Sequence, residues 1–243
     1  MLYAEEDIIR IRTITPLRVS ESELKRRQER YNKLSPTSLQ IDLVNLPDNP
    51  NVPTTLDNEA AIRASDHFVY EEAMRTDWSV YDAILLDCVL DPALDRLEQD
   101  AAIPAYGILK LAASFLASLG HSFAAVTRNQ VIGDELQSRI EHYGLAPKFH
   151  QLIRLDLSFE DIADDRRWNT AIGGALDQLD GSDVRSVING CSAVNVHPDD
   201  RHSAVVVDPT ALALKLLGVA TASHIGAHRA AVSLDVNQAH FHT

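Results

Sequence analysis

The chain has 243 residues, 45% of them hydrophobic and 23% charged, and its formal net charge at pH 7 is −13. This length allows one large domain or two modest lobes with a shared core, and the composition excludes collagen-like, disordered and disulfide-rich classes. The acidic excess argues against a nucleic-acid partner, because binding nucleic acid needs clustered lysine and arginine.

The first seven residues, Met1–Asp7, lack the basic start and apolar segment of a signal peptide. No apolar run approaches the roughly 20 residues of a membrane span. We therefore expect a cytoplasmic protein with no membrane partner. In that compartment, two cysteines are more typical of reduced, chemically active thiols than of a structural disulfide.

In the first half of the chain, apolar spacing predicts alternating strands and helices. The expected strands are residues 8–15, 39–46 and 82–88, with 103–107 a strand or turn, and the expected helices are 23–31, 57–75 and a short one ending at Leu97. Residues 47–55 contain three prolines and are therefore expected to form a loop. This loop could be a lid over a cleft or an ordinary surface connection. The basic cluster on the first helix is expected to be a solvated face; it comprises Lys25, Arg26, Arg27 and Arg30.

The second half continues this alternation. The expected strands are residues 122–127, 149–155, 183–191 and 204–209, the expected helices are 109–119, 132–142, 168–179 and 210–222, and the polar tail 237–243 is expected to fray. Such alternation predicts an α/β fold with parallel sheets. Because the two halves show a similar alternation of strands and helices, we expect two pseudo-symmetric lobes, each a parallel sheet flanked by helices, with the active-site cleft between them. The first lobe would contain residues 1–108 and 209–243, and the second residues 109–208.

The chain has only two cysteines, Cys88 and Cys191, and each follows a short apolar run that predicts a buried strand. Open parallel sheets present ligand sites at the carboxyl ends of their strands, so two half-sites facing each other are expected. A turn and helix after each thiol would supply N–H groups that lower the pKa of the cysteine and can bind an anionic oxygen. The alternative is that each cysteine only packs in the core.

Other chemistry is not indicated. Neither cysteine has a second cysteine or a histidine at zinc-binding spacing, so no metal site is predicted. P-loop, G-x-G-x-x-G and G-x-S-x-G motifs are absent, so ATP, NAD and flavin are not expected. The histidines near the C-terminus are expected to be exposed tail residues; they are His224, His228, His240 and His242.

Five segments carry a family resemblance. They are Tyr81–Leu94, which contains Cys88-Val-Leu-Asp-Pro-Ala-Leu94, then Ile103–Gly107, Phe123–Thr127, Gly190–Ser192 and Val206–Pro209. In this order and spacing the sequence resembles the aspartate/glutamate/hydantoin racemase superfamily, and most closely its hydantoin and allantoin racemase branch. The resemblance implies two lobes with the site between them, a small-molecule substrate and no metal or organic cofactor. It also implies a homo-oligomer, a dimer or larger.

The resemblance further implies roles for individual residues. Cys88 and Cys191 would be the acid/base pair of a proton exchange at a carbon next to a carbonyl. The predicted substrate-binding residues are the amides of Val89, Leu90, Ser192 and Ala193, with Thr127 and Arg128 from the second lobe and Pro16 from the end of the first strand. Arg18 is either a carboxylate contact or an ordinary exposed arginine.

Two segments depart from the branch pattern. Residues 14–18 read Ile-Thr-Pro-Leu-Arg where the branch has Asn-Pro-Asn, and residues 192–195 read Ser-Ala-Val-Asn where it has residues such as Ala-Gly-Met. These departures leave the substrate open. The expected reaction is racemisation or epimerisation of a hydantoin-like or amino-acid-derived compound. The alternatives are a cysteine-dependent isomerase or decarboxylase of a dicarboxylic acid and a non-catalytic ligand-binding relative.

Overall fold

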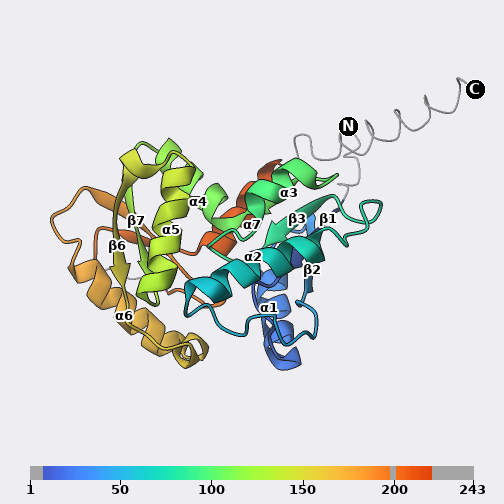
Figure 1. The fold of residues 1–243 in the computed structure, drawn as a ribbon. Coiled ribbons are helices and arrows are strands. Elements are labelled where there is room, and N and C mark those ends of the chain that lie inside the picture. Colours follow the sequence, from blue (N-terminus) through green and yellow to red (C-terminus); the bar gives the residue numbers. More distant parts are fainter. Residues whose placement is uncertain (1–7, 198–200, 221–243) are drawn as a thin grey trace, which may run out of the picture.

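The computed structural model describes residues 8–197 and 201–220, so the predicted tail and its histidines lie outside the described residues. The described chain forms two four-stranded sheets, both parallel, with the orders β2-β1-β3-β4 and β6-β5-β7-β8 (Figure 1). The first sheet contains β1 (Ile9–Ile14), β2 (Leu39–Val44), β3 (Ala83–Leu86) and β4 (Ala105–Gly107). The second contains β5 (Ser122–Thr127), β6 (Phe149–Arg154), β7 (Val184–Asn189) and β8 (Val205–Val207). The predicted α/β fold with parallel sheets is confirmed.

Helices connect the strands. They are α1 (Glu21–Leu34), α2 (Glu59–Ala73), α3 (Leu94–Asp100), α4 (Ile108–Ser118), α5 (Gln130–His142), α6 (Asp165–Asp177) and α7 (Pro209–Ala220), with 3-10 turns η1 (Ala146–Lys148) and η2 (Glu160–Ala163). Helix α6 begins three residues before its predicted start, because the Asp164 side chain accepts a hydrogen bond from the Arg167 amide at 3.0 Å and caps the helix.

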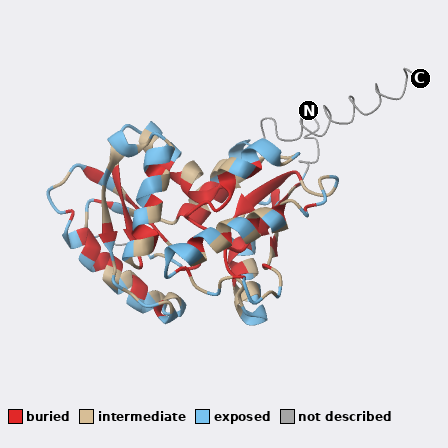
Figure 2. Ribbon diagram, in the orientation of Figure 1, coloured by how far each residue is buried: buried red, intermediate tan, exposed pale blue. Residues whose placement is uncertain are grey.

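The buried side chains form three clusters that follow the alternation of strand residues. In β3, Leu85 faces a central cluster, whereas Ile84 and Leu86 face an outer cluster beneath α2 and α3. The central cluster also contains Ile11 of β1 and Ala125 of β5, so both sheets contribute to one apolar core. A second outer cluster joins the other sheet to α6. Figure 2 shows the strands buried and the outward faces of the helices exposed.

Helices α4 and α7 pack against each other between the two sheets (Figure 1). The predicted lobe boundaries, 108/109 and 208/209, fall at the starts of these two helices. The division into lobes stays a prediction, because the central apolar core joins both parts. Within the described ranges, no helix combines the length and the apolar character needed to cross a bilayer.

Candidate active site

The two cysteines line one cavity. Cys88 lies two residues beyond the end of β3, and Cys191 lies two residues beyond the end of β7. The cavity has a volume of ≈ 60 Å³. Its lining residues are Pro16, Leu17, Arg27, Leu56, Cys88, Val89, Leu90, Arg128, Ile132, Phe159, Ile162, Gly190, Cys191, Ser192 and Ala193. The site therefore lies where β1, β3, β5 and β7 end, as expected for parallel sheets.

The cavity brings together most of the predicted site residues. Besides the cysteines, these are Pro16, Val89, Leu90, Arg128, Ser192 and Ala193. Arg18 lies outside the lining and forms an ion pair with Asp48 at 3.4 Å. Thr127 also lies outside it, fully buried, and its hydroxyl donates to the carbonyl oxygen of Asn129 at 3.3 Å. Substrate contacts by Arg18 and Thr127 stay predictions.

Cys88 is held in a tight turn after β3. The Leu90 amide donates to its sulfur at 3.4 Å, as the sequence predicts for a thiol at a strand end. Burial nevertheless raises the pKa of Cys88 to about 12, outweighing the opposite effect of that amide, and the charges of Asp87, Asp91 and Cys191 raise it further. The prediction of a lowered pKa is therefore wrong for this thiol, because desolvation is the larger effect.

Cys191 is less buried than Cys88 and has different charged neighbours. Burial raises its pKa as well, while the amide of Ala193 and the positive charge of Arg27 act in the opposite direction. The predicted lowering is wrong here too. No helix follows Cys191 in the described chain before β8, so the expected helix end does not face this thiol.

Gly190 allows the two central strands of the second sheet to approach closely beside Cys191. A Cβ atom at this position would lie 2.2 Å from the carbonyl oxygen of Val126. The Gly190 amide donates to that same oxygen at 2.8 Å. The glycine of the Gly-Cys-Ser segment is therefore required by backbone packing.

Asp91 connects the Cys88 turn to helix α4. Its buried carboxylate accepts hydrogen bonds from the amides of Leu109 and Lys110, at 3.0 and 2.8 Å, and from the Tyr143 hydroxyl at 3.0 Å. A Cβ atom at Gly107 would lie 2.3 Å from the carboxyl carbon of Asp91. The Asp-Pro and Tyr-Gly segments therefore meet at the start of α4 and pack tightly there.

The prediction that the basic cluster of α1 is a solvated face is wrong for Arg27 and Arg30, whereas Lys25 is exposed as expected. Arg27 and Arg30 are only 6% and 7% exposed. The Arg27 guanidinium donates to the Asp87 carboxylate at 2.9 Å and to Glu23 at 2.8 Å, and it lines the cavity. Arg30 donates to the carbonyl oxygen of Val194 at 3.1 Å, so α1 contacts the turn after Cys191.

A sequence signal for Arg27 was available. Leu24, Arg27, Tyr31 and Leu34 are three, four and three residues apart, which places them on one helix face. Leu24, Tyr31 and Leu34 all pack on the central core. An arginine within an apolar stripe indicates a buried charge that needs a partner. Its partner, Asp87, directly precedes Cys88 but is 60 residues away along the chain.

Arg128 lies at the end of β5 and is 5% exposed. Its guanidinium pairs with Asp57, which precedes α2, and lies 5.7 Å from the centre of the Phe159 ring. Its Nε atom is buried and has no hydrogen-bond partner among the described residues. Arg128 thus brings a buried donor to the cavity from the second sheet, held by a carboxylate from the other half of the chain.

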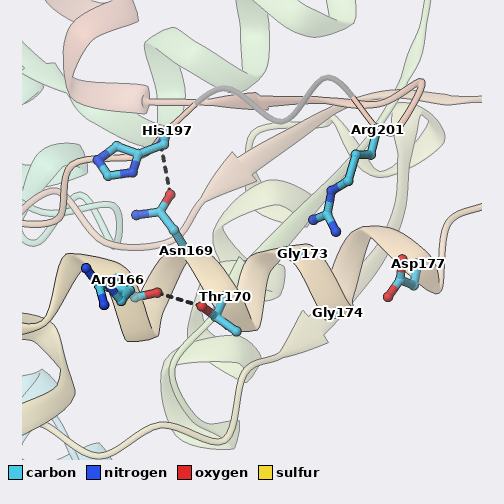
Figure 3. Close-up of a pocket in the computed structure, with 8 residues that line it drawn as sticks. All are labelled: Arg166, Asn169, Thr170, Gly173, Gly174, Asp177, His197 and Arg201. Atoms are coloured by element: carbon cyan, nitrogen blue, oxygen red, sulfur yellow. Dashed lines mark hydrogen bonds between the residues drawn. The ribbon is translucent and has the colours of Figure 1, made fainter.

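A second hollow lies on the outer surface beside α6 (Figure 3). Its lining residues are Arg166, Asn169, Thr170, Gly173, Gly174, Asp177, His197 and Arg201. None of them lines the cysteine cavity. Nearby, Asp177, Asp180 and His202 place ligand atoms within 4.8 Å of one another, but both aspartates are exposed, and exposed acidic groups are common without a metal.

Residues 14–217 match the family described as Asp/Glu/Hydantoin racemase. The chain belongs to this family. The match covers strands β2 to β8, both cysteines and every residue that lines the cavity. No curated protein sequence gives a significant match.

Solved structures show the same fold. Allantoin racemase from Pseudomonas fluorescens superposes with a TM-score of 0.75 at 16% identity, covering 86% of this chain and 88% of that one. Allantoin racemase from Klebsiella pneumoniae gives 0.72 at 16% identity, covering 88% of each chain. A variant of arylmalonate decarboxylase gives 0.59 at 14% identity, covering 84% and 89%. The family match confirms the superfamily resemblance drawn from the sequence motifs, and the solved structures confirm its fold.

Proposed function

We propose that the protein is a cofactor-independent racemase or epimerase that exchanges the proton at the Cα of a hydantoin-like or amino-acid-derived substrate. The observation that carries this proposal is that Cys88 and Cys191, from different sheets, line the same cavity. Membership of a racemase family and the likeness to two allantoin racemases support an isomerase.

The chemistry needs one thiolate and one thiol. The thiolate removes the Cα proton, and the electron pair of the C–H bond moves onto the adjacent carbonyl oxygen as an enolate. The opposite thiol then delivers its proton to the other face of Cα and becomes the thiolate. Acid–base help of this kind contributes roughly 10²–10⁴-fold to the rate.

The enolate oxygen needs fixed hydrogen-bond donors. Val89, Leu90, Ser192 and Ala193 bring backbone amides to the two turns that carry the thiols. Both arginines of the cavity are already paired with carboxylates, Arg27 with Asp87 and Arg128 with Asp57. This balance of charge favours a substrate whose reacting part is a ring carbonyl or imide over one with two free carboxylates.

The experiment is a polarimetric and mass-spectrometric screen in D₂O of 5-substituted hydantoins, allantoin, aspartate and glutamate. We expect loss of optical rotation and deuterium at Cα for at least one of them. Cys88→Ser and Cys191→Ser should each abolish racemisation while the fold, followed by circular dichroism, is retained. Near wild-type turnover in either variant would contradict the two-thiol mechanism.

The same screen separates the alternative reactions. A decarboxylase would release CO₂ from a malonate-type acid, and a cis–trans isomerase would convert a dicarboxylic acid without deuterium at a saturated Cα. A ligand-binding relative would bind one of the compounds without converting it. Any of these results replaces the proposed racemase.

A further inference from the structure

We propose that Arg27 is a positioning residue that makes the two thiols unequal, holding the Cys88 turn through Asp87 and favouring Cys191 as the thiolate of the resting protein. The catalytic meaning of this inference rests on the proposed function. The order in which the thiols ionise does not depend on the proposed function, so the inference and the proposed function can be contradicted separately.

The first support is that the charge of Arg27 is fixed in place. Its Nε and Nη1 atoms donate to Glu23 and Asp87 at 2.8 and 2.9 Å. The other oxygen of Asp87 accepts a hydrogen bond from the Tyr31 hydroxyl at 2.8 Å. Both oxygens of this buried carboxylate are therefore engaged, so the guanidinium cannot swing away without leaving Asp87 buried and unpaired.

The second support is that Arg27 reaches both thiol-bearing turns. Asp87 directly precedes Cys88, and its carbonyl oxygen accepts a hydrogen bond from the Ser192 hydroxyl at 3.0 Å. Arg27 lines the cavity that both thiols share, and its positive charge favours ionisation of Cys191. One buried cation thus lies beside the second thiol while it is anchored to the strand end of the first.

The third support is the sign of the charges around each thiol. Cys191 is faced by the cations Arg27 and Arg30 of α1 and by Asp87 and Cys88 at the end of β3. Arg128, at the end of β5, lines the same cavity.

Among the groups around Cys88, Asp87, Asp91 and Cys191 oppose its ionisation. Arg27 and Arg128 line its cavity as well, and Asp66 and Arg139 line a smaller cavity at this thiol. Arg139 is already paired there with three carboxylates, those of Asp66, Asp95 and Glu135.

Burial raises the pKa of both thiols, and one turn amide lowers each of them, Leu90 for Cys88 and Ala193 for Cys191. The two thiols therefore differ in the charges of the turns that carry them. Asp87 and Asp91 lie beside Cys88 in its turn, whereas Arg26 and Arg30 of α1 donate to the carbonyl oxygens of Ala193 and Val194, at 2.9 and 3.1 Å, in the turn after Cys191.

In the proposed reaction, the enantiomer whose Cα proton faces Cys191 meets the protein in the reactive ionisation state. The other enantiomer must wait for the proton to move from Cys88 to Cys191. Because enantiomers have equal free energies in water, kcat/KM must be the same in both directions. The inequality of the two thiols therefore changes kcat and KM in proportion. Both constants are larger for one enantiomer than for the other.

The test titrates each thiol alone. In Cys88→Ser, Cys191 is followed by thiolate absorbance and by the rate of iodoacetamide alkylation against pH, and Cys88 is followed in the same way in Cys191→Ser. We expect Cys191 to ionise at the lower pH. If Cys88 ionises first, or both at the same pH, the inference is overturned, and this comparison needs no change at Arg27.

The role of Arg27 itself is tested by adding Arg27→Gln to Cys88→Ser. Loss of the cation should raise the midpoint of Cys191 by about one pH unit, and Arg27→Lys should restore it. A merely loosened structure would expose the thiol and lower the midpoint, because burial raises the pKa. Lys25→Gln, an exposed charge loss on the same helix, is the matched control and should change nothing. An unchanged or lowered midpoint in Arg27→Gln contradicts the proposal.

Deuterium exchange separates this inference from the proposed function. If the thiols ionise in the expected order but no compound exchanges its Cα proton, the inference is supported and the proposed racemase function is contradicted. If a compound exchanges its Cα proton but Cys88 ionises at the lower pH, the racemase function is supported and the inference is contradicted.

Discussion

The hydroxyl of Ser192 donates a hydrogen bond of 3.0 Å to the carbonyl oxygen of Asp87. Ser192 directly follows Cys191, and Asp87 directly precedes Cys88, so this bond joins the two turns that carry the thiols across the two halves of the chain. Both residues are buried. The separation of the sulfur atoms is therefore held by the residues next to them as well as by the sheets.

Ser192→Ala should lower kcat by roughly 10-fold, because small displacements of a reacting group are costly. The free energy of unfolding should fall by only about 1 kcal/mol, the typical net contribution of one hydrogen bond. Ser118→Ala is the matched control, since Ser118 donates to the carbonyl oxygen of Phe115 at an exposed helix end. Equal kcat values for the two variants would show that the Ser192 bond does not position the thiols. Steady-state kinetics and urea unfolding measure both effects.

Gly190→Ala should destabilise the protein by roughly 1–3 kcal/mol, because the new Cβ would meet the backbone carbonyl of Val126 at 2.2 Å. The strain falls directly before Cys191, so the rate of deuterium exchange should drop as well. Gly174→Ala is the control: nothing lies within 4 Å of its Cβ, and alanine in this helix should stabilise the fold by about 0.5–1 kcal/mol. Thermal unfolding should show shifts of opposite sign, and a Gly190→Ala variant as stable as wild type would refute the close approach of the strands.

Asp91 should make stability depend on pH between its ordinary pKa of 3.8 and its raised pKa of about 6. Burial raises this pKa, so the protonated form is favoured by folding. Its contribution is complete below the unfolded value and is lost as the pH rises through about 6, a change of roughly 3 kcal/mol. The advantage of wild type over Asp91→Asn should therefore shrink from about pH 4 to about pH 7. Urea unfolding of wild type and Asp91→Asn across this pH range measures the change, and a difference that stays constant with pH would contradict it.

Arg128→Met should raise KM by roughly 10- to 100-fold with a smaller change in kcat, because a hydrogen bond from a charged group contributes about 1.5–3 kcal/mol to binding. Asp57→Asn removes the carboxylate partner of Arg128 but leaves the guanidinium in the cavity. The KM of Asp57→Asn should therefore rise less than the KM of Arg128→Met. Initial rates over a range of substrate concentrations give these KM values. Equal KM values for Arg128→Met and wild type would show that Arg128 does not bind the substrate.

Local signals determined the elements of the fold. Prolines, capping residues and apolar periodicity depend on neighbours within a few positions, so the strands that end before Cys88 and Cys191 could be predicted from the sequence. The amides of Leu90 and Ala193 could be placed beside the thiols for the same reason. The motif segments also indicated the family, since their order and spacing are properties of the sequence itself.

Only the tertiary structure decided the electrostatics of the site. The apolar stripe of α1 can indicate that Arg27 is buried, but it cannot identify the partner. Asp87 lies on another element, and an ion pair between distant segments leaves no local pattern. The pKa of Cys88 was expected to fall, but packing of both halves around the turn removes water from the sulfur, and desolvation outweighs one amide. Sequence spacing determined which groups lie at the strand ends, whereas burial and pairing across the fold decided their charge.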